Sequence, residues 1–135
     1  MSDDDTFPTA PGVITVRCRG SMESVFGRVI IEIDRVGAQV FAVLDHSGAA
    51  AVAGLHLPPT KVIVFGNPHG GTPLMMERPL LALDLPVKLL LWESANGDVF
   101  LSYNDPALLA NRYRLPQNAR GPLHAVEVVA AAAHD

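Results

Sequence analysis

The chain has 135 residues, 49% of them hydrophobic, and a formal net charge of −4. This length suits one domain with a single core, and the hydrophobic content excludes disorder for most of the chain. Basic residues gather only as Arg17 with Arg19 and as a loose group between 112 and 120. Nucleic-acid binding through phosphate contacts needs a stronger cluster, so we expect no nucleic-acid partner.

The chain gives no sign of export or of a membrane span. A basic region followed by an apolar run is missing at the N-terminus, and no uninterrupted apolar segment approaches about 18 residues. We therefore expect a soluble cytoplasmic protein without a membrane partner. Cys18 is the only cysteine, which excludes an intrachain disulfide, and we expect it to be a small buried residue rather than a reactive thiol.

The predicted domain occupies residues 12–135, after a flexible N-terminal tail at 1–11. A strand is expected at 13–19, where polar and apolar residues alternate in the second half. The clearest helix covers 22–36, because apolar residues recur there at three- and four-residue spacing. Within this helix we expect Arg28 and Glu32 to form an exposed ion pair.

The next two strands each run into a polar turn. Residues 40–44 lead into Asp45-His46-Ser47 and a short alanine-rich helix, and residues 62–65 lead into Gly66-Asn67-Pro68. Thr72-Pro73 is expected to begin the following helix, because threonine is a good cap and proline suits the first helical position. Gly70 and Gly71 would then supply turn conformations closed to other residues.

The second half of the chain predicts a hairpin and two helices. Asn96-Gly97 separates two apolar runs, the strongest short signal for a hairpin. Pro106 is expected to open a helix capped by Asp105. The last helix, 123–133, is apolar on most sides, so the body of the protein or a second copy must cover it. The order of elements predicts an α+β fold with a small, mainly antiparallel sheet and helices packed on one face.

Seven short motifs appear in order along the chain. They are Phe41-Ala42-Val43-Leu44-Asp45-His46, Leu57-Pro58-Pro59-Thr60, Phe65-Gly66-Asn67-Pro68, Gly71-Thr72-Pro73-Leu74-Met75, Leu83-Asp84-Leu85-Pro86, Trp92-Glu93 and Tyr103-Asn104-Asp105-Pro106.

With these motifs the chain resembles a bacterial and archaeal family catalogued as domain of unknown function 302, over roughly residues 13–113. The resemblance implies an α+β domain of the TATA-box-binding-protein-like fold, usually a homodimer, and it brings no established activity. His56 and His69 stand at positions where other polar or charged residues are expected in this family. The alanine-rich segment after Pro116 lies outside the resemblance.

Polar residues at three strand ends are the candidate site, since loops after strands often carry binding residues. We expect the three ends to converge on one pocket if their strands are neighbours. The candidates are Asp45, His46, Asn67, Gly70, Gly71, Thr72, Tyr103, Asn104 and Asp105.

Each candidate has a predicted role and a simpler interpretation. His46 would act as acid–base or ligand-binding group, with Asp45 or Asp105 as its partner. Asn67 and the glycine-rich turn would hold an anion or a carbonyl oxygen at a helix N-terminus, beside an apolar wall formed by Met75 and Met76. The simpler interpretation is that the carboxylates and Asn67 cap turns and helices and that the methionines fill the core.

The favoured function is a homodimer that binds a small ligand, anionic or amide-like, at this pocket. One alternative is a small enzyme with acid–base or hydrolytic chemistry through His46. The other is a structural protein whose dimer interface is its whole function. No catalytic triad, phosphate loop or metal-ligand spacing is complete, so we expect neither a cofactor nor a metal. Ile31 and the helix from Leu123 are the candidate interface.

Overall fold

A five-stranded, fully antiparallel sheet with the strand order β1-β5-β4-β3-β2 forms the centre of the computed structural model, which describes residues 9–135. The strands are β1 (Val13–Cys18), β2 (Gln39–Asp45), β3 (Thr60–Gly66), β4 (Val87–Glu93) and β5 (Val99–Asn104). The predicted α+β class with an antiparallel sheet is confirmed. The predicted tail, 1–11, falls mostly outside the described residues.

Five α-helices and three short 3-10 helices connect and follow these strands. The α-helices are α1 (Met22–Arg35), α2 (His46–Val52), α3 (Pro68–Glu77), α4 (Pro106–Arg112) and α5 (Ala125–Ala133). The 3-10 helices are η2 (Pro79–Leu83), η3 (Gln117–Ala119) and η4 (Gly121–His124).

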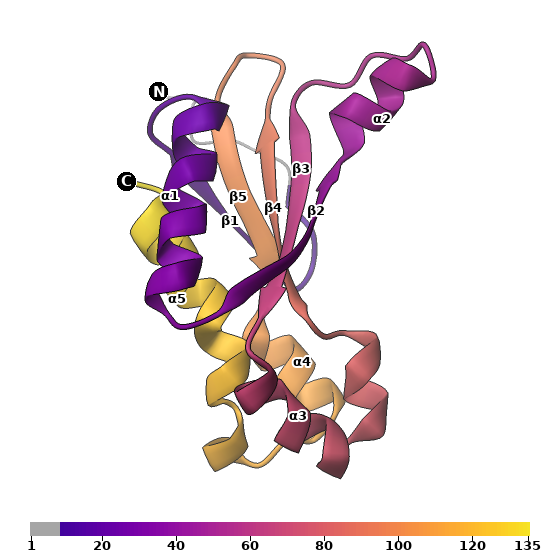
Figure 1. The fold of residues 1–135 in the computed structure, drawn as a ribbon, viewed down its shortest axis with the longest axis vertical. Coiled ribbons are helices and arrows are strands. Elements are labelled where there is room, and N and C mark those ends of the chain that lie inside the picture. The colour runs from indigo at the N-terminus through magenta and orange to yellow at the C-terminus, as the bar shows by residue number, and fades with distance from the viewer. Residues whose placement is uncertain (1–8) are drawn as a thin grey trace.

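The main core lies between one face of the sheet and helices α1 and α5, which run side by side over it (Figure 1). The apolar stripe of α1 buries Val25, Val29 and Ile33 completely or nearly so. Val129 of α5 and Leu101 of β5 lie in the same cluster. The apolar last helix is therefore covered by the body of its own chain, which removes its inner face from the candidate interface.

The predicted pair between Arg28 and Glu32 is wrong. Arg28 Nε instead donates to the carbonyl oxygen of Ala133 at 2.8 Å, and Glu32 accepts an ion pair from Arg35 at 2.9 Å. The reason lies in the tertiary packing: the end of α5 brings unpaired helix carbonyls beside α1.

A second apolar cluster lies at the end of the sheet where α3 and α4 gather (Figure 1). Its buried members come from α3, η2, α4 and the C-terminal segment, and they are Leu74, Leu81, Leu109, Ala110, Leu115 and Leu123. This cluster fixes α3 against the C-terminal segment.

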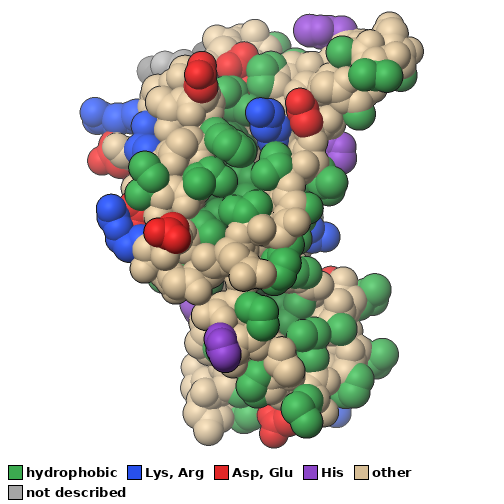
Figure 2. Space-filling model, viewed as in Figure 1, with side chains coloured by type: hydrophobic (Ala, Val, Ile, Leu, Met, Phe, Trp, Pro, Cys, Tyr) green, Lys and Arg blue, Asp and Glu red, His purple; other side chains and the backbone are tan. Residues whose placement is uncertain are grey.

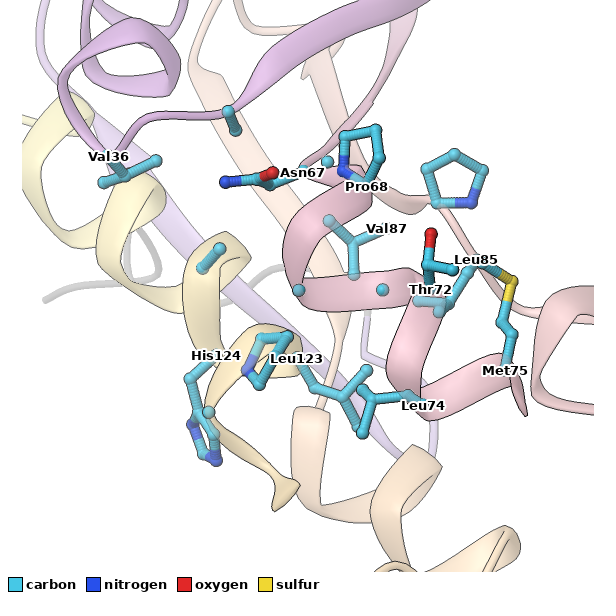
Figure 3. A pocket seen from close by; sticks show the side chains of 18 of the residues that line it. Val36, Asn67, Pro68, Thr72, Leu74, Met75, Leu85, Val87, Leu123 and His124 are labelled. Atoms are coloured by element: carbon cyan, nitrogen blue, oxygen red, sulfur yellow. The ribbon is translucent and has the colours of Figure 1, made fainter. Parts of the chain in front are cut away.

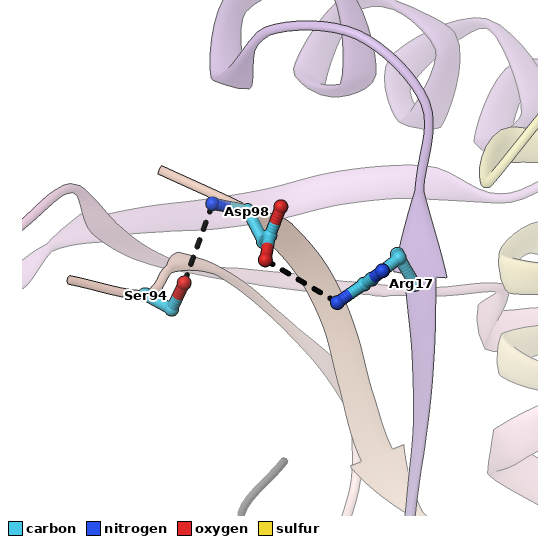
Figure 4. Close-up of polar contacts among 3 residues, drawn as sticks. All are labelled: Arg17, Ser94 and Asp98. Carbon is cyan, nitrogen blue, oxygen red and sulfur yellow. Dashed lines mark hydrogen bonds and ion pairs between the residues drawn. The ribbon is translucent and has the colours of Figure 1, made fainter. Parts of the chain in front are cut away.

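The hairpin between β4 and β5 is confirmed. Gly97 has a φ of +88°, as the Asn-Gly turn requires, and the Ser94 N–H donates to the Asp98 carbonyl at 2.8 Å. Arg17 of β1 forms an ion pair with Asp98 at 3.2 Å, and the Asp98 N–H donates to the Ser94 hydroxyl (Figure 4). These contacts tie β1 to the turn of the hairpin.

Helix α2 extends away from the rest of the fold, and β2 leads to it along the edge of the sheet, paired with β3 (Figure 1); we refer to residues 39–57 as the β2–α2 arm. Every residue of β2 is exposed, and α2 buries none of its residues. Large apolar side chains are nevertheless frequent along the arm, where Val52 is 92% exposed. The others are Val40, Phe41, Val43, Leu44, Leu55 and Leu57. Hydrophobic side chains along the arm are visible in Figure 2.

Candidate functional site

A pocket of about 500 Å³ opens between α3 and the C-terminal segment (Figure 3). Five parts of the chain build it: the end of α1, the start of β2, residues 66–75, residues 85–87 and residues 121–128. Leu74, Val87 and Leu123 are buried and form its floor. A cavity of this size lies within the range of small-molecule sites in proteins.

Asn67 starts the helix that forms one wall of the pocket. Its side-chain oxygen accepts from the His69 N–H at 2.9 Å, its amide donates to the Gly37 carbonyl at 3.2 Å, and Pro68 takes the first helical position. The prediction that Thr72-Pro73 begins this helix is therefore wrong. Asn67-Pro68 carries the same cap-and-proline signal earlier in the chain, and the helix forms from there.

The two glycines of α3 serve a different purpose from the predicted one. Both are helical, and neither has a positive φ. A Cβ on Gly70 would lie 3.2 Å from the Cβ of Pro122, so glycine allows the C-terminal segment to approach α3 closely. A Cβ on Gly71 would meet its nearest neighbours, Leu85 and Met75, at 3.8 Å, an ordinary contact. Gly71 thus leaves room that belongs to the pocket.

The polar groups around the pocket are few. Among the described residues, Asn67, Thr72 and His124 are the only polar or ionisable side chains that line it, and no lysine, arginine, aspartate or glutamate does so. The His124 ring extends away from the other labelled side chains in Figure 3, and its Nδ1 lies 3.5 Å from a Glu127 carboxylate oxygen. The pocket is therefore apolar with a small polar rim.

The three strand ends do not converge on this pocket as the sequence suggested. Asn67 and the predicted turn residues, Gly70, Gly71 and Thr72, line it together. In the antiparallel β2–β3 pair, however, Asp45 lies opposite Lys61, whereas Gln39 lies opposite Gly66. Asp45 and His46 are consequently at the other end of the sheet, beside α2 (Figure 1).

Asp45 caps α2 and does not orient His46. Its carboxylate accepts from the Ser47 hydroxyl at 2.8 Å and from the Gly48 N–H at 2.9 Å. The Gly48 and Ser47 hydrogen bonds are the largest influences that hold the pKa of this carboxyl below its usual range. His46 is exposed, and within residues 9–135 no hydrogen bond of its ring is found. The Asp–His pair on which the enzyme hypothesis rested is not formed.

The residues at the end of β5 have structural roles. Tyr103 is 7% exposed in the main core, where burial, with smaller contributions from Glu127 and Asp105, raises the pKa of its hydroxyl. Asp105 caps α4 by accepting from the Ala107 N–H at 3.0 Å. Neither residue, nor Asn104, lines the pocket beside α3. Asp105 is thus a helix cap, as the simpler interpretation held.

The sequence identified five of the twenty described residues that line the pocket and missed the others. Met75 lines it as expected, whereas Met76 is 80% exposed and lies outside it. The residues that sequence reasoning missed come mostly from distant segments, and they include Val36, Phe41, Leu85, Pro122, His124 and Val128. Phe41 and Leu85 belong to two of the seven short motifs, but neither motif by itself indicates a pocket.

Within residues 9–135, no group of three or more histidine, cysteine, aspartate or glutamate side chains lies close enough to hold a metal ion. None of the helices in this range is long and apolar enough to cross a membrane.

Comparison with known proteins gives a family and a fold. The family described as "Domain of unknown function DUF302" matches residues 14–132. The match includes the alanine-rich segment after Pro116, so its exclusion from the resemblance was wrong. A crystal structure of an uncharacterized conserved DUF302 protein from Bacillus stearothermophilus superposes with a TM-score of 0.78 at 20% identity, covering 93% of this chain and 98% of that one.

Curated relatives have longer chains. Two proteins named fluoride-specific ion channels, FluC 1 of Brucella suis and FluC 2 of Brucella melitensis, are each 45% identical over 104 residues. The match covers 77% of this chain, but only 41% and 38% of those proteins.

Proposed function

The chain belongs to the DUF302 family, and on that premise we propose that it is a small-molecule-binding module that acts as a homodimer. The family name assigns no activity, so the proposal rests on the molecule itself. The observation that carries it is the pocket of about 500 Å³ beside α3.

The arrangement of the pocket favours binding over catalysis. Its floor is preformed by Leu74, Val87 and Leu123, each at most 7% exposed. The acid–base candidates of the sequence, Asp45 and His46, lie at the far end of the sheet. A preformed apolar cavity with a few polar groups is typical of a ligand site.

Native mass spectrometry of the protein as purified tests the site. Gly71→Leu would fill the pocket, and Gly27→Leu is a matched control, because Gly27 is also helical and nothing lies within 4 Å of a Cβ built there. We expect a retained small molecule on the wild type and on Gly27→Leu, and none on Gly71→Leu. A wild-type protein without any bound mass, or equal retention by all three proteins, would argue against the proposal.

The homodimer is proposed to form along the β2–α2 arm. β2 is an edge strand, and its outer backbone groups face no other strand among residues 9–135. Its apolar side chains are exposed on both faces, where natural edge strands usually carry charges or prolines. Residues 39–44 carry no charge, so two copies of the strand can meet without opposing like charges. A two-fold interface requires this kind of self-complementarity.

Sedimentation velocity separates the arm from the interface predicted by sequence. Val43→Arg combined with Leu44→Arg places a charge on each face of β2, whereas Ile31→Arg changes the exposed outer side of α1. We expect a dimer for the wild type and Ile31→Arg, and a monomer for the double variant. A monomeric wild type would contradict the dimer, and dissociation by Ile31→Arg alone would move the interface to α1.

A second candidate function comes from the relatives. They are named fluoride-specific ion channels, and the matched region makes up only 38% to 41% of them. The domain is then an accessory module that modulates a channel in the same or a neighbouring chain. Two variants of the Brucella suis relative test this, one lacking the matched region and one with this chain in its place. Altered fluoride efflux from liposomes after deletion, restored by the replacement, would support it, and unchanged efflux would argue against it.

A further inference from the structure

The side chains that line the pocket indicate whether its ligand is charged or neutral. Within residues 9–135, no lysine, arginine, aspartate or glutamate lines the pocket, and its floor is aliphatic. Transfer of an ionised group into such surroundings is costly unless an opposite charge or several donors compensate it. The glycine-rich sequence suggested an anionic ligand. Such a ligand would need free hydrogen-bond donors at the start of α3 to compensate its charge.

The donors at the start of α3 are already used. The His69 N–H donates to the Asn67 side-chain oxygen at 2.9 Å. The N–H groups of Gly70 and Gly71 both donate to the Asn67 carbonyl, at 3.0 and 2.9 Å. Asn67 itself also donates its amide to the Gly37 carbonyl. An anion would have to break these hydrogen bonds, so the start of α3 provides few free donors to bind it.

One polar group on the rim is free to bind a ligand. Thr72 stands beside Leu85, Val87 and Met75 in the pocket (Figure 3). Among the hydrogen bonds within residues 9–135, none involves its hydroxyl. A hydroxyl both donates and accepts, so it can pair with an alcohol, a carbonyl or an amide without meeting a charge.

We infer that the pocket takes a neutral, mainly hydrocarbon ligand whose single hydroxyl or carbonyl group pairs with Thr72. This inference rests on the proposed function of the pocket and narrows its ligand class. The hydrocarbon part covers Leu74, Val87 and Leu123, and the space beside Gly71 admits it. The polar end lies at the open rim, where Thr72 is exposed.

Displacement of the neutral fluorophore N-phenyl-1-naphthylamine tests the ligand class with two matched competitors, 1-decanol and decanoate at pH 8. They share a hydrocarbon chain and differ in charge at one end. We expect decanol to bind at least tenfold more tightly than decanoate. Gly71→Leu should abolish displaceable fluorophore binding, and Gly27→Leu should leave it unchanged.

Thr72→Val gives a second test that does not depend on filling the pocket. The variant keeps the shape of an exposed side chain and removes its hydroxyl. We expect decanol affinity to fall about three- to tenfold, the effect of one hydrogen bond. An unchanged decanol affinity in Thr72→Val would overturn the assignment of Thr72.

The outcomes distinguish the ligand class from the site itself. Decanoate binding as tightly as decanol, and lost in Gly71→Leu, would overturn the neutral class and leave the pocket as a ligand site. Binding of all probes that Gly71→Leu does not change would place them elsewhere and overturn the inference. A wild type that binds none of the three probes and retains no molecule in native mass spectrometry would overturn both the inference and the proposed function.

Discussion

Gly70 of α3 and Pro122 of η4 lie in such close contact that a Cβ on the glycine would sit 3.2 Å from the proline Cβ. This contact joins two walls of the pocket. Gly70→Val should therefore push the C-terminal segment away and lower the free energy of unfolding by about 1–3 kcal/mol. Gly71→Val is the matched control, because a Cβ there has its nearest neighbour at 3.8 Å. Urea denaturation of both variants measures the difference, and equal stabilities would contradict this role for Gly70.

Arg28 should stabilise the end of α5. Its Nε donates to the Ala133 carbonyl at 2.8 Å from a part-buried position. Hydrogen bonds from charged groups contribute about 1.5–3 kcal/mol, so Arg28→Ala should cost about this amount. Arg35→Ala removes only an exposed ion pair with Glu32 and should cost at most about 0.5 kcal/mol. If chemical denaturation ranks the two variants equally, the contact between α1 and α5 is not a significant source of stability.

Cys18 should be inert to thiol reagents in the folded protein. Burial raises the pKa of its thiol from 9.0 to about 11, more than the nearby Arg28 lowers it. A thiol whose pKa is raised by folding contributes stability below pH 9, and this contribution is lost as the pH rises toward 11. Between pH 9 and 11 the wild type should lose stability more steeply than Cys18→Ala, as measured by urea denaturation. Parallel pH profiles would contradict the raised pKa.

Asp45 should titrate below its ordinary pKa of 3.8. The Gly48 N–H and the Ser47 hydroxyl stabilise its ionised form. A carboxyl whose pKa is lowered by folding contributes stability above its unfolded pKa, and that contribution disappears as the pH falls through the folded pKa. Carboxyl-detected NMR titration should therefore show a low pKa for Asp45. Ser47→Ala should raise it toward 3.8, and no change in this variant would contradict the contribution of the Ser47 hydroxyl.

Local sequence patterns predicted most of the fold because local contacts determine those elements. The 22–36 periodicity placed α1 correctly, and Asn96-Gly97 placed the β4–β5 hairpin. The start of α3 was missed because Asn67-Pro68 and Thr72-Pro73 both match a cap followed by proline. The structure shows that Gly70 and Gly71 continue a helix, which propensity alone disfavours, and that Gly70 lies in close contact with Pro122.

The sequence predicted only the part of the candidate site that is local in the chain. Asn67 and Thr72 are neighbours in sequence and line one pocket. His46 was assigned to it on the assumption that strand ends meet, but the antiparallel register puts the C-terminal ends of β2 and β3 at opposite ends of the sheet. The wall formed by residues 121–128 depends on long-range packing of α5, which no local pattern encodes.

The measurement that tests the central claim most directly is a ¹H–¹⁵N NMR titration of the wild-type protein with 1-decanol. We predict saturable shifts at the amides that surround the pocket, including Gly66, Gly71 and His124, with little change along α2. Shifts confined to the β2–α2 arm, or none at all, would contradict a ligand site beside α3.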